Sequence, residues 1–337
     1  MSKASSSCLL KSAAILLSIC ASMVHAQSST QLYGGVDAGI GSFKTSGGVR
    51  TTQQYSGGMT TSYFGLKGGE DLGGGLRAFF TLEAYFRADT GEAGRFGGDA
   101  FFSRASNVGV GGDFGVLLLG RMATPLFAHT AGFNPLGASF GFSPLIRNTY
   151  GAGTRVSGDA AWNNALGYQS PVWQGISVNA LYGLKEVGGG RNVSLGVRYV
   201  RGSLAVGGVV QAVKSPFAAG EEKTYQLGGS YDLGVVKLFA THGEVRRREM
   251  PGLPAGGTDN PISQLGASMP AGGSGTVMAS WSRAGDDATA PGTRSFATIG
   301  YSHRLSKRTD VYLMLMTDKA QAQDRAQSTA VGIRHAF

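Results

Sequence analysis

The sequence predicts an all-β fold, a closed antiparallel transmembrane β-barrel. The first observation is an alternation of side chains, in which apolar residues occupy every second position from Leu76 to Phe86. Arg77, Glu83 and Arg87 lie in the gaps between them. Successive side chains of a strand point to opposite faces, so one face of this strand is apolar and the other is charged. In a membrane barrel the apolar face meets lipid and the charged face meets water in the channel.

The second observation is that this alternation recurs along the chain, while short connectors alternate with long ones. Short turns on one side and long loops on the other are typical of outer-membrane barrels. About 16 strands of about 10 residues would take roughly half of the chain, and no segment shows a sustained helical period. The clearest predicted strands are 31–38, 76–87, 176–186, 192–199, 203–213, 224–232, 235–244, 276–283, 294–303, 309–318 and 328–337. The longer connectors are 41–60, 89–98, 214–222, 245–263 and 285–293.

The first 26 residues predict a secretory signal peptide. Lys3 and Lys11 precede an apolar stretch, and Val24-His25-Ala26 matches the pattern expected before a cleavage site. The apolar stretch is shorter than the roughly 20 residues that a membrane-spanning helix needs. We therefore expect cleavage after Ala26, which leaves residues 27–337 as one barrel domain in the outer membrane.

Composition excludes several other classes of protein. Both cysteines, Cys8 and Cys20, lie in the predicted signal peptide, so the mature chain has no disulfide, thiolate metal site or cysteine nucleophile. The chain has 30 Lys and Arg against 21 Asp and Glu; without Lys3 and Lys11, 28 basic residues remain and the net charge is +7. These charges are dispersed, so no nucleic-acid partner is predicted. The 55 glycines, about twice the usual share, suit a soluble β-sandwich array as well as a membrane barrel.

Six motifs narrow the choice to one family. They are LYGGVDAG at 32–39, FGLKGGEDLGGGL at 64–76, LGR at 119–121, SYDLGVVKL at 230–238, LSKRT at 305–309 and VGIRHAF at 331–337. They resemble the Gram-negative general porins of the β-proteobacterial and neisserial type, over essentially the whole mature chain. The resemblance implies a 16-stranded barrel, a homotrimer in outer-membrane lipid, and a third extracellular loop that folds into the lumen as a constriction loop. Residues 121–162, where no convincing strand is found, lie where that loop belongs.

Alternation and resemblance together give the candidate pore residues. A pore selects ions at a narrow, charged constriction, so charged side chains that face the lumen are the candidates. For each of them, a solvated charge at the rim is the alternative. Arg104 resembles a wall arginine of the family, and only the resemblance gives its direction. The predicted constriction set is Arg87, Arg104, Arg121, Glu83, Arg147, Arg155 and Asp159, and the predicted lumen-lining set is Lys67, Arg77, Tyr85, Lys185, Arg198, Lys237 and Arg334.

Three positions depart from the pattern of the family. Tyr63 stands where the family commonly has a wall arginine, and Gly167 and Gln169 stand where it usually has arginine and aspartate. The stretch 121–162 carries three arginines and a single carboxylate, Asp159. Because acidic groups on the loop are nearly absent, the sequence predicts a preference for anions.

The predicted function is a water-filled channel for passive diffusion of small hydrophilic solutes and ions, and no enzyme. The four histidines after residue 26 have no catalytic or metal-binding spacing, so neither a metal nor a cofactor is expected. The alternative is a structural or adhesive barrel whose channel the loop blocks. The terminal Phe337, with Ile333 and Val331 on the same face, resembles the signal that the barrel assembly machinery recognises.

Overall fold

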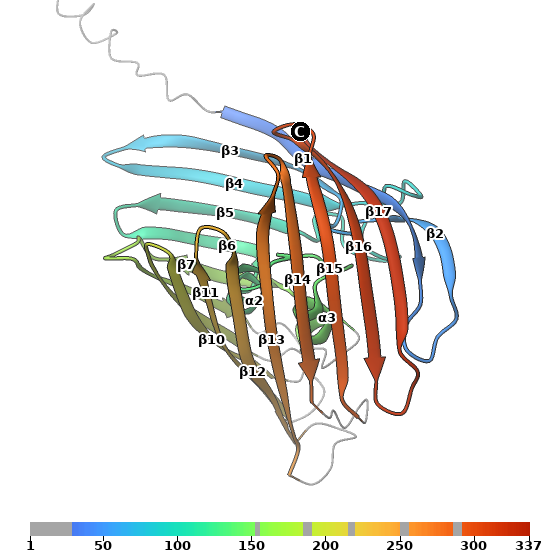
Figure 1. The fold of residues 1–337 in the computed structure, drawn as a ribbon. Coiled ribbons are helices and arrows are strands. Elements are labelled where there is room, and N and C mark those ends of the chain that lie inside the picture. The colour runs from blue at the N-terminus through green and yellow to red at the C-terminus, as the bar shows by residue number, and fades with distance from the viewer. Residues whose placement is uncertain (1–28, 152–155, 185–190, 215–219, 250–255, 286–291) are drawn as a thin grey trace, which may run out of the picture.

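The computed structural model describes residues 29–151, 156–184, 191–214, 220–249, 256–285 and 292–337. Within them, 17 strand segments form one antiparallel sheet that closes on itself, because β1 pairs with β17 (Figure 1). The predicted signal peptide lies outside the described residues. The strands are β1 Ser29–Phe43, β2 Thr51–Ser56, β3 Tyr63–Gly73, β4 Leu76–Tyr85, β5 Ala105–Gly112, β6 Gly115–Ala123, β7 Ala161–Gln169, β8 Ile176–Gly183, β9 Asn192–Arg201, β10 Leu204–Lys214, β11 Glu221–Asp232, β12 Lys237–Arg248, β13 Thr258–Ala271, β14 Gly275–Ala284, β15 Arg294–Arg304, β16 Thr309–Ala320 and β17 Ala326–Ala336.

β2 and β3 are two halves of one barrel strand. β1 pairs with β2 through residues 38–43 and with β3 through residues 29–35, so both segments continue along the same neighbour. Counted as one, they give a closed barrel of 16 strands, which confirms the predicted fold. Residues 57–62 interrupt this strand on the lumen side. There the buried carboxylate of Asp37 accepts hydrogen bonds from the backbone N–H groups of Met59 and Thr60 at 2.8 and 2.7 Å.

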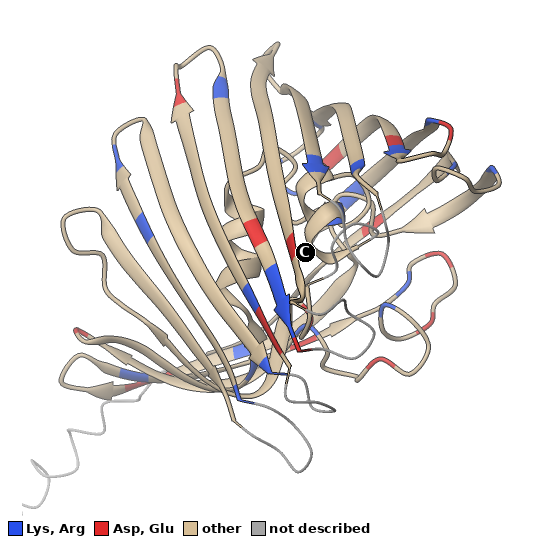
Figure 2. Cartoon of the chain, turned by 90° about the horizontal axis from the view of Figure 1, so that it is seen from below, with Lys and Arg blue, Asp and Glu red and all other residues tan. Residues whose placement is uncertain are grey.

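The alternation of residues 76–87 is the inside–outside alternation of the barrel wall. In the register of β3 and β4, Tyr63 lies opposite Tyr85 and Lys67 opposite Thr81, so these side chains share the lumen face. The other face carries exposed apolar side chains such as that of Leu66, as a lipid-facing surface does. Figure 2 shows that long stretches of the strands carry no charged residue and that charges gather toward strand ends and loops.

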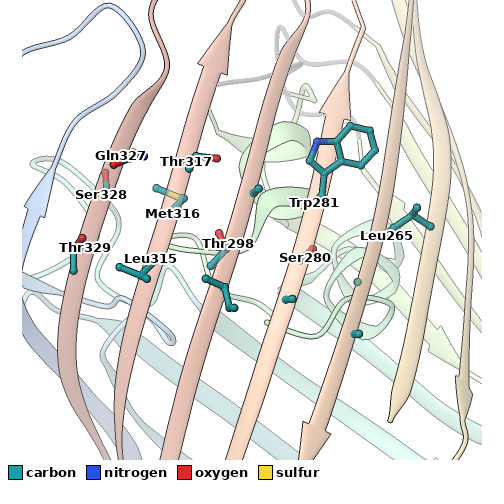
Figure 3. A pocket seen from close by; sticks show the side chains of 15 residues that line it. Leu265, Ser280, Trp281, Thr298, Leu315, Met316, Thr317, Gln327, Ser328 and Thr329 are labelled. Atoms are coloured by element: carbon teal, nitrogen blue, oxygen red, sulfur yellow. The ribbon is translucent and has the colours of Figure 1, made fainter.

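The outer surface is hollowed over β13–β17 (Figure 3). The hollow has a volume of about 680 Å³ and lies among the exposed side chains of Leu265, Trp281 and Leu315. Its lining also includes residues with short side chains, and these leave the space: Ala267, Ala279 and Ala297. Another apolar group is therefore able to approach the backbone closely at this part of the wall.

The connector between β6 and β7 enters the barrel and carries two short helices, α2 Pro125–Gly132 and α3 Pro144–Tyr150 (Figure 1). Thr124 and Ser143 cap the two helices, and a proline follows each cap in the first turn, where its missing N–H costs nothing. The loop spans residues 124–160, which is shorter than the predicted 121–162, because β6 continues to Ala123 and β7 begins at Ala161. Neither helix is long and apolar enough to cross a membrane.

Two of the predicted long loops are wrong in their bounds. Residues 41–60 contain β2, and the loop predicted at 245–263 begins only after β12 ends at Arg248 and finishes before β13 starts at Thr258. The strand ends concerned, such as Thr51–Ser56, carry largely polar residues on both faces. The hydrogen-bonded ladder continues beyond the lipid, where an alternation of hydrophobicity no longer marks it.

Candidate pore constriction

The inward loop covers one side of the lumen and leaves the other side exposed. α2 packs mainly on β9–β11 and α3 on β13–β15, with Leu126, Phe142 and Leu145 fully buried between loop and wall. The tip of the loop is held by two hydrogen bonds of 2.7 Å: the Ser139 hydroxyl donates to the Gly58 carbonyl, and Thr298 donates to the carbonyl of Phe142. The lumen-facing side chains of β3 and β4 remain on the uncovered side.

Arg104 is the centre of a polar and aromatic cluster on this uncovered wall. Its Nε lies 3.1 Å from Oε2 of Glu83, and its guanidinium carbon lies 4.1 Å from the centroid of the Tyr63 ring and 5.7 Å from that of Tyr85. The hydroxyl of Tyr33 donates to the other carboxylate oxygen of Glu83 at 2.7 Å. The structure therefore brings three predicted pore residues, Arg104, Glu83 and Tyr85, together on the lumen face.

A glycine makes room for this cluster. Gly65 lies opposite Glu83 in the register of β3 and β4. A Cβ atom at Gly65 would stand 2.9 Å from Cγ of Glu83 and 3.3 Å from Cζ of Tyr33, closer than ordinary contact allows. A larger residue here would displace the carboxylate that pairs with Arg104.

Two lumen-facing cations have no carboxylate partner among the described residues. Lys67 on β3 places its Nζ 4.7 Å from the ring centroid of Tyr33, and Arg198 on β9 lies 5.1 Å from the ring of Phe133 on the loop. Both side chains are exposed to water. Beside Arg198, burial and then the positive charge of Arg198 lower the pKa of His129 to about 4, so this histidine is neutral at physiological pH.

The other predicted lining cations lie near carboxylates. Arg334 pairs with Asp310 at 3.0 Å and donates to the hydroxyl of Thr60 at 2.9 Å. The remaining two lie near the ends of their hairpins, directly opposite an aspartate in the register: Arg77 opposite Asp71, and Lys237 opposite Asp232. Their positive charge is thus accompanied by negative charge at short range.

A second charged cluster lies in the connector between β4 and β5 and at the end of the inward loop. Arg95 donates to Asp99 at 2.9 Å and to Asp159 at 3.1 Å, and Arg121 pairs with Asp159 at 3.3 Å. Burial opposes ionisation of both aspartates, but the hydrogen bonds and charge of Arg95 outweigh it: the pKa of Asp99 falls to about 2 and the pKa of Asp159 is also lowered. The sequence analysis does not single out Arg95 and Asp99, although two opposite charges four residues apart in a loop can indicate an ion pair.

Three of the predicted constriction arginines contact other groups than those around Arg104. Arg121 follows a bulge at Gly120 on β6, its side chain is largely buried, and its guanidinium donates to the Ser103 carbonyl at 2.6 Å. Arg87 pairs with Glu92 at 2.7 Å in the connector after β4.

Arg147 on α3 donates to carbonyl groups of its own loop, those of Phe140 and Gly141. Its guanidinium carbon lies 4.8 Å from the ring of Phe296 on β15, against the covered wall. The two remaining candidates, Arg155 and Lys185, lie outside the described residues.

The departures in sequence have visible consequences in the wall. Tyr63, in place of a wall arginine, supplies the ring on which Arg104 lies. At Gly167, a Cβ atom would stand 2.5 Å from the sulfur of Met122, so a side chain here would displace that of Met122. Met122 belongs to a buried apolar cluster with Trp162 and Leu181, and this part of the wall is therefore apolar where the family usually has charge. In the described part of the chain, no group of three His, Cys, Asp or Glu is placed to hold a metal ion.

Comparison with known proteins agrees with this architecture. A family model described as Gram-negative porin matches residues 12–323. The chain is 32% identical over 343 residues to outer membrane porin protein 32 of Delftia acidovorans, covering 93% of this chain and 95% of that one. It is 29% identical over 386 residues to an outer membrane porin protein of Bordetella pertussis, covering 96% of this chain and 98% of that one.

Solved structures give the same answer. The anion-selective porin from Comamonas acidovorans superposes with a TM-score of 0.78 at 28% identity, covering 92% of this chain and 100% of that one. The trimer form of OmpT from Vibrio cholerae has a TM-score of 0.70 at 15% identity, covering 92% of this chain and 99% of that one, a likeness of fold alone. The chain belongs to the Gram-negative porin family: it is an outer-membrane β-barrel that forms a water-filled channel for passive diffusion of small hydrophilic solutes.

Proposed function

We propose that this porin prefers anions, and that ions pass between the inward loop and the wall of β3 and β4. The observation that carries the proposal is the exposure of Lys67, Arg77 and Arg198 to water, although their side chains face the lumen of a barrel that contains a loop. Water thus reaches the charged face of the wall. A loop that filled the lumen would instead bury Lys67 and Arg198, which lie farther from the turns than Arg77 does.

The balance of charge supports an anion preference. Four lumen-facing carboxylates are each in an ion pair with an arginine: Glu83, Glu222, Asp310 and Asp318. A fifth, Asp37, is buried and accepts hydrogen bonds from two backbone N–H groups and from the hydroxyl of Tyr312. Lys67 and Arg198 are not paired with a carboxylate in the described part of the chain, so their field acts on passing ions. Two unit charges 4 Å apart interact by about 1 kcal/mol in bulk water and about 4 kcal/mol at an effective dielectric constant of 20. The similar porin from Comamonas acidovorans carries the description anion-selective, which supports the same preference here.

The reversal potential across a planar bilayer under a potassium chloride gradient tests this proposal. We expect the sign for chloride over potassium, and we expect Lys67→Gln and Arg198→Gln each to reduce the permeability ratio about two-fold or more, because each removes an uncompensated charge. Lys319→Gln is the matched control, since Lys319 lies on the outward face near the end of β16 and donates to the Gln323 carbonyl. A cation-selective sign, or an equal effect of the control, would refute the proposal.

The proposal includes the remaining features that the sequence predicts: cleavage after Ala26, delivery to the barrel assembly machinery, transport without a chemical reaction, and a homotrimer. Support for the homotrimer comes from the outer face of β1 and β3, where Leu32 and Ile40 are each 61% exposed beside Gly34, Ala38 and Gly68. Small residues let neighbouring backbones approach closely in lipid, where hydrophobicity alone gives little driving force. Native mass measurement in mild detergent tests this, and a purely monomeric species would contradict the trimer.

A further inference from the structure

Aromatic rings and basic side chains occur together along the uncovered wall. We call the seven residues concerned the aromatic–basic track. They come from β1, β3, β4 and the residue before β5, and all face the lumen: Tyr33, Tyr63, Lys67, Arg77, Phe79, Tyr85 and Arg104.

Each cation of the track lies near the face of a ring. Arg104 is 4.1 Å from the centroid of Tyr63, Lys67 is 4.7 Å from that of Tyr33, and Arg77 is 6.0 Å from that of Phe79. The rings of Tyr33 and Tyr63 meet edge to face at 6.2 Å. A cation beside a ring offers two kinds of contact within a few ångströms, a charge and a π surface.

The register spaces these pairs along the strand, which runs obliquely through the wall. On β4, Arg77, Phe79, Glu83 and Tyr85 occur on alternate residues of the lumen face, and a rise of about 3.4 Å per residue spreads them over roughly 27 Å. Glycines stand opposite two of the four, Gly69 opposite Phe79 and Gly65 opposite Glu83, so the opposing strand adds no bulk there. At the lower end, Arg77 and Phe79 line a hollow of about 510 Å³.

The loop adds a second aromatic surface. Phe127, Phe140 and Tyr150 pack together on the inward loop, with Phe127 stacked on Phe140 at 5.8 Å and edge-on to Tyr150 at 5.6 Å. All three side chains are only half-buried, although the opposite face of the loop is fully packed against the wall. Rings therefore occur both on the wall and on the loop.

We infer that the aromatic–basic track selects aromatic carboxylates, molecules of the benzoate class, over aliphatic anions of equal charge. The inference rests on the proposed anion-preferring passage and names its substrate class. A carboxylate pairs most strongly with Lys67, which has no carboxylate partner among the described residues, and less with Arg77 and Arg104, whose charges Asp71 and Glu83 offset. The attached ring packs on the neighbouring Tyr or Phe. Glu83 does not repel such an anion strongly, because Arg104 and the hydroxyl of Tyr33 occupy its two oxygens. An aliphatic anion gains the charge but not the ring contact.

The test is block of the chloride current through the full-length porin in a planar bilayer. Sodium benzoate, cyclohexanecarboxylate and acetate are titrated separately at neutral pH, with maltose as a neutral ligand that also stacks on rings. We expect benzoate to bind roughly three- to ten-fold more tightly than cyclohexanecarboxylate, since ring–ring contacts contribute about 0.5–1.5 kcal/mol beyond buried area. Phe79→Leu and Tyr63→Leu should each reduce this ratio, while Lys67→Gln should weaken both carboxylates alike.

Tyr231→Leu is the matched control, because Tyr231 is 49% exposed on the outward face of β11 and should leave the ratio unchanged. Chloride conductance in the absence of ligand shows separately that each variant has folded and forms a channel. A conducting porin that binds benzoate and cyclohexanecarboxylate equally overturns the inference, and so does a preference that survives both Phe79→Leu and Tyr63→Leu. Maltose binding as tight as benzoate binding would overturn it too, because it would assign the track to neutral sugars. Loss of anion selectivity with intact benzoate discrimination would affect the proposed function alone.

Discussion

Glu83 determines how much of the charge of Arg104 a passing ion meets. The carboxylate pairs with Arg104 at 3.1 Å and accepts the hydroxyl of Tyr33 at 2.7 Å, so the central arginine of the wall is largely neutralised. Alternation along residues 76–87 predicted that Glu83 faces water. Alternation alone did not predict which way Arg104 points, because this residue precedes β5 and does not follow the inside–outside alternation of that strand. It also did not predict the contacts of Arg147, whose partners are carbonyls of a folded loop.

At the scale of this residue, we predict that Glu83→Gln strengthens the anion preference. Removing the carboxylate charge leaves Arg104 uncompensated at short range, and the chloride-to-potassium permeability ratio should rise about two-fold or more. Arg104→Gln should lower the ratio relative to Glu83→Gln. Glu92→Gln is the control, since Glu92 pairs with Arg87 and is 57% exposed, where water screens its charge. A lower chloride-to-potassium permeability ratio in Glu83→Gln would contradict the role of Arg104 in the anion preference.

At the scale of elements, the inward loop is held by its ends as much as by its helices. Ser157 donates to Glu222 through its backbone N–H at 2.7 Å and through its hydroxyl at 3.0 Å, and Arg247 pairs with Glu222 at 2.8 Å. Position in the chain and resemblance predicted that the loop turns inward. The sequence analysis did not predict the two helices, because α2 with eight residues and α3 with seven are too short to establish a helical period.

We predict that Glu222→Gln destabilises the barrel and loosens the loop. Removing one partner of a buried ion pair typically costs about 3–5 kcal/mol, because the buried charge of the other loses a large part of its compensation. The melting of folded protein, followed by its heat-modifiable migration in gels, should shift to lower temperature, and single-channel current should become noisier. The double variant Glu222→Gln/Arg247→Met should recover part of the loss. Lys223→Gln, which breaks the exposed pair with Glu221, is the control that should change little.

The connector between β4 and β5 should respond to acid through Asp99. Its pKa in the folded state, about 2, is below the usual value of about 3.9, so ionised Asp99 stabilises the connector. This contribution is complete above about pH 4 and is lost as the pH falls through about 2. Asp99→Asn should therefore lower Tm at pH 6 and make little difference at pH 2. An equal difference in Tm at both pH values would contradict the role of the Arg95–Asp99 pair.

At the scale of the whole molecule, the two ends of the chain meet to close the barrel. The backbone N–H of Phe337 donates to the Gly34 carbonyl at 3.1 Å, and Gly34 donates back at 3.2 Å. The ring of Phe337 lies over Gly34, where a Cβ atom would stand 2.6 Å from its Cζ. A closed barrel was predictable because alternation and connector length repeat along the chain, and the number of strands followed from the chain length and the family resemblance. The placement of the passage was not, because it depends on which wall the loop covers, and that follows from apolar contacts between residues far apart in sequence.

We predict that Phe337→Ala lowers the yield of folded, heat-modifiable porin in the membrane. The substitution removes both the terminal aromatic that resembles an assembly signal and the ring that covers Gly34 at the seam. Phe114→Ala is the matched control, since Phe114 is 44% exposed in the turn between β5 and β6. Unchanged folding yield in Phe337→Ala would refute the assembly role.

Single-channel conductance in a planar bilayer tests the central claim most directly, that the lumen between the inward loop and the wall of β3 and β4 is a continuous water-filled passage. Purified porin should give discrete steps of current, proportional to salt concentration and close to ohmic at low voltage. The steps should change in size when Lys67 or Arg198 is neutralised. Folded protein that inserts into the bilayer without conducting would contradict the claim and would mean that the loop blocks the barrel.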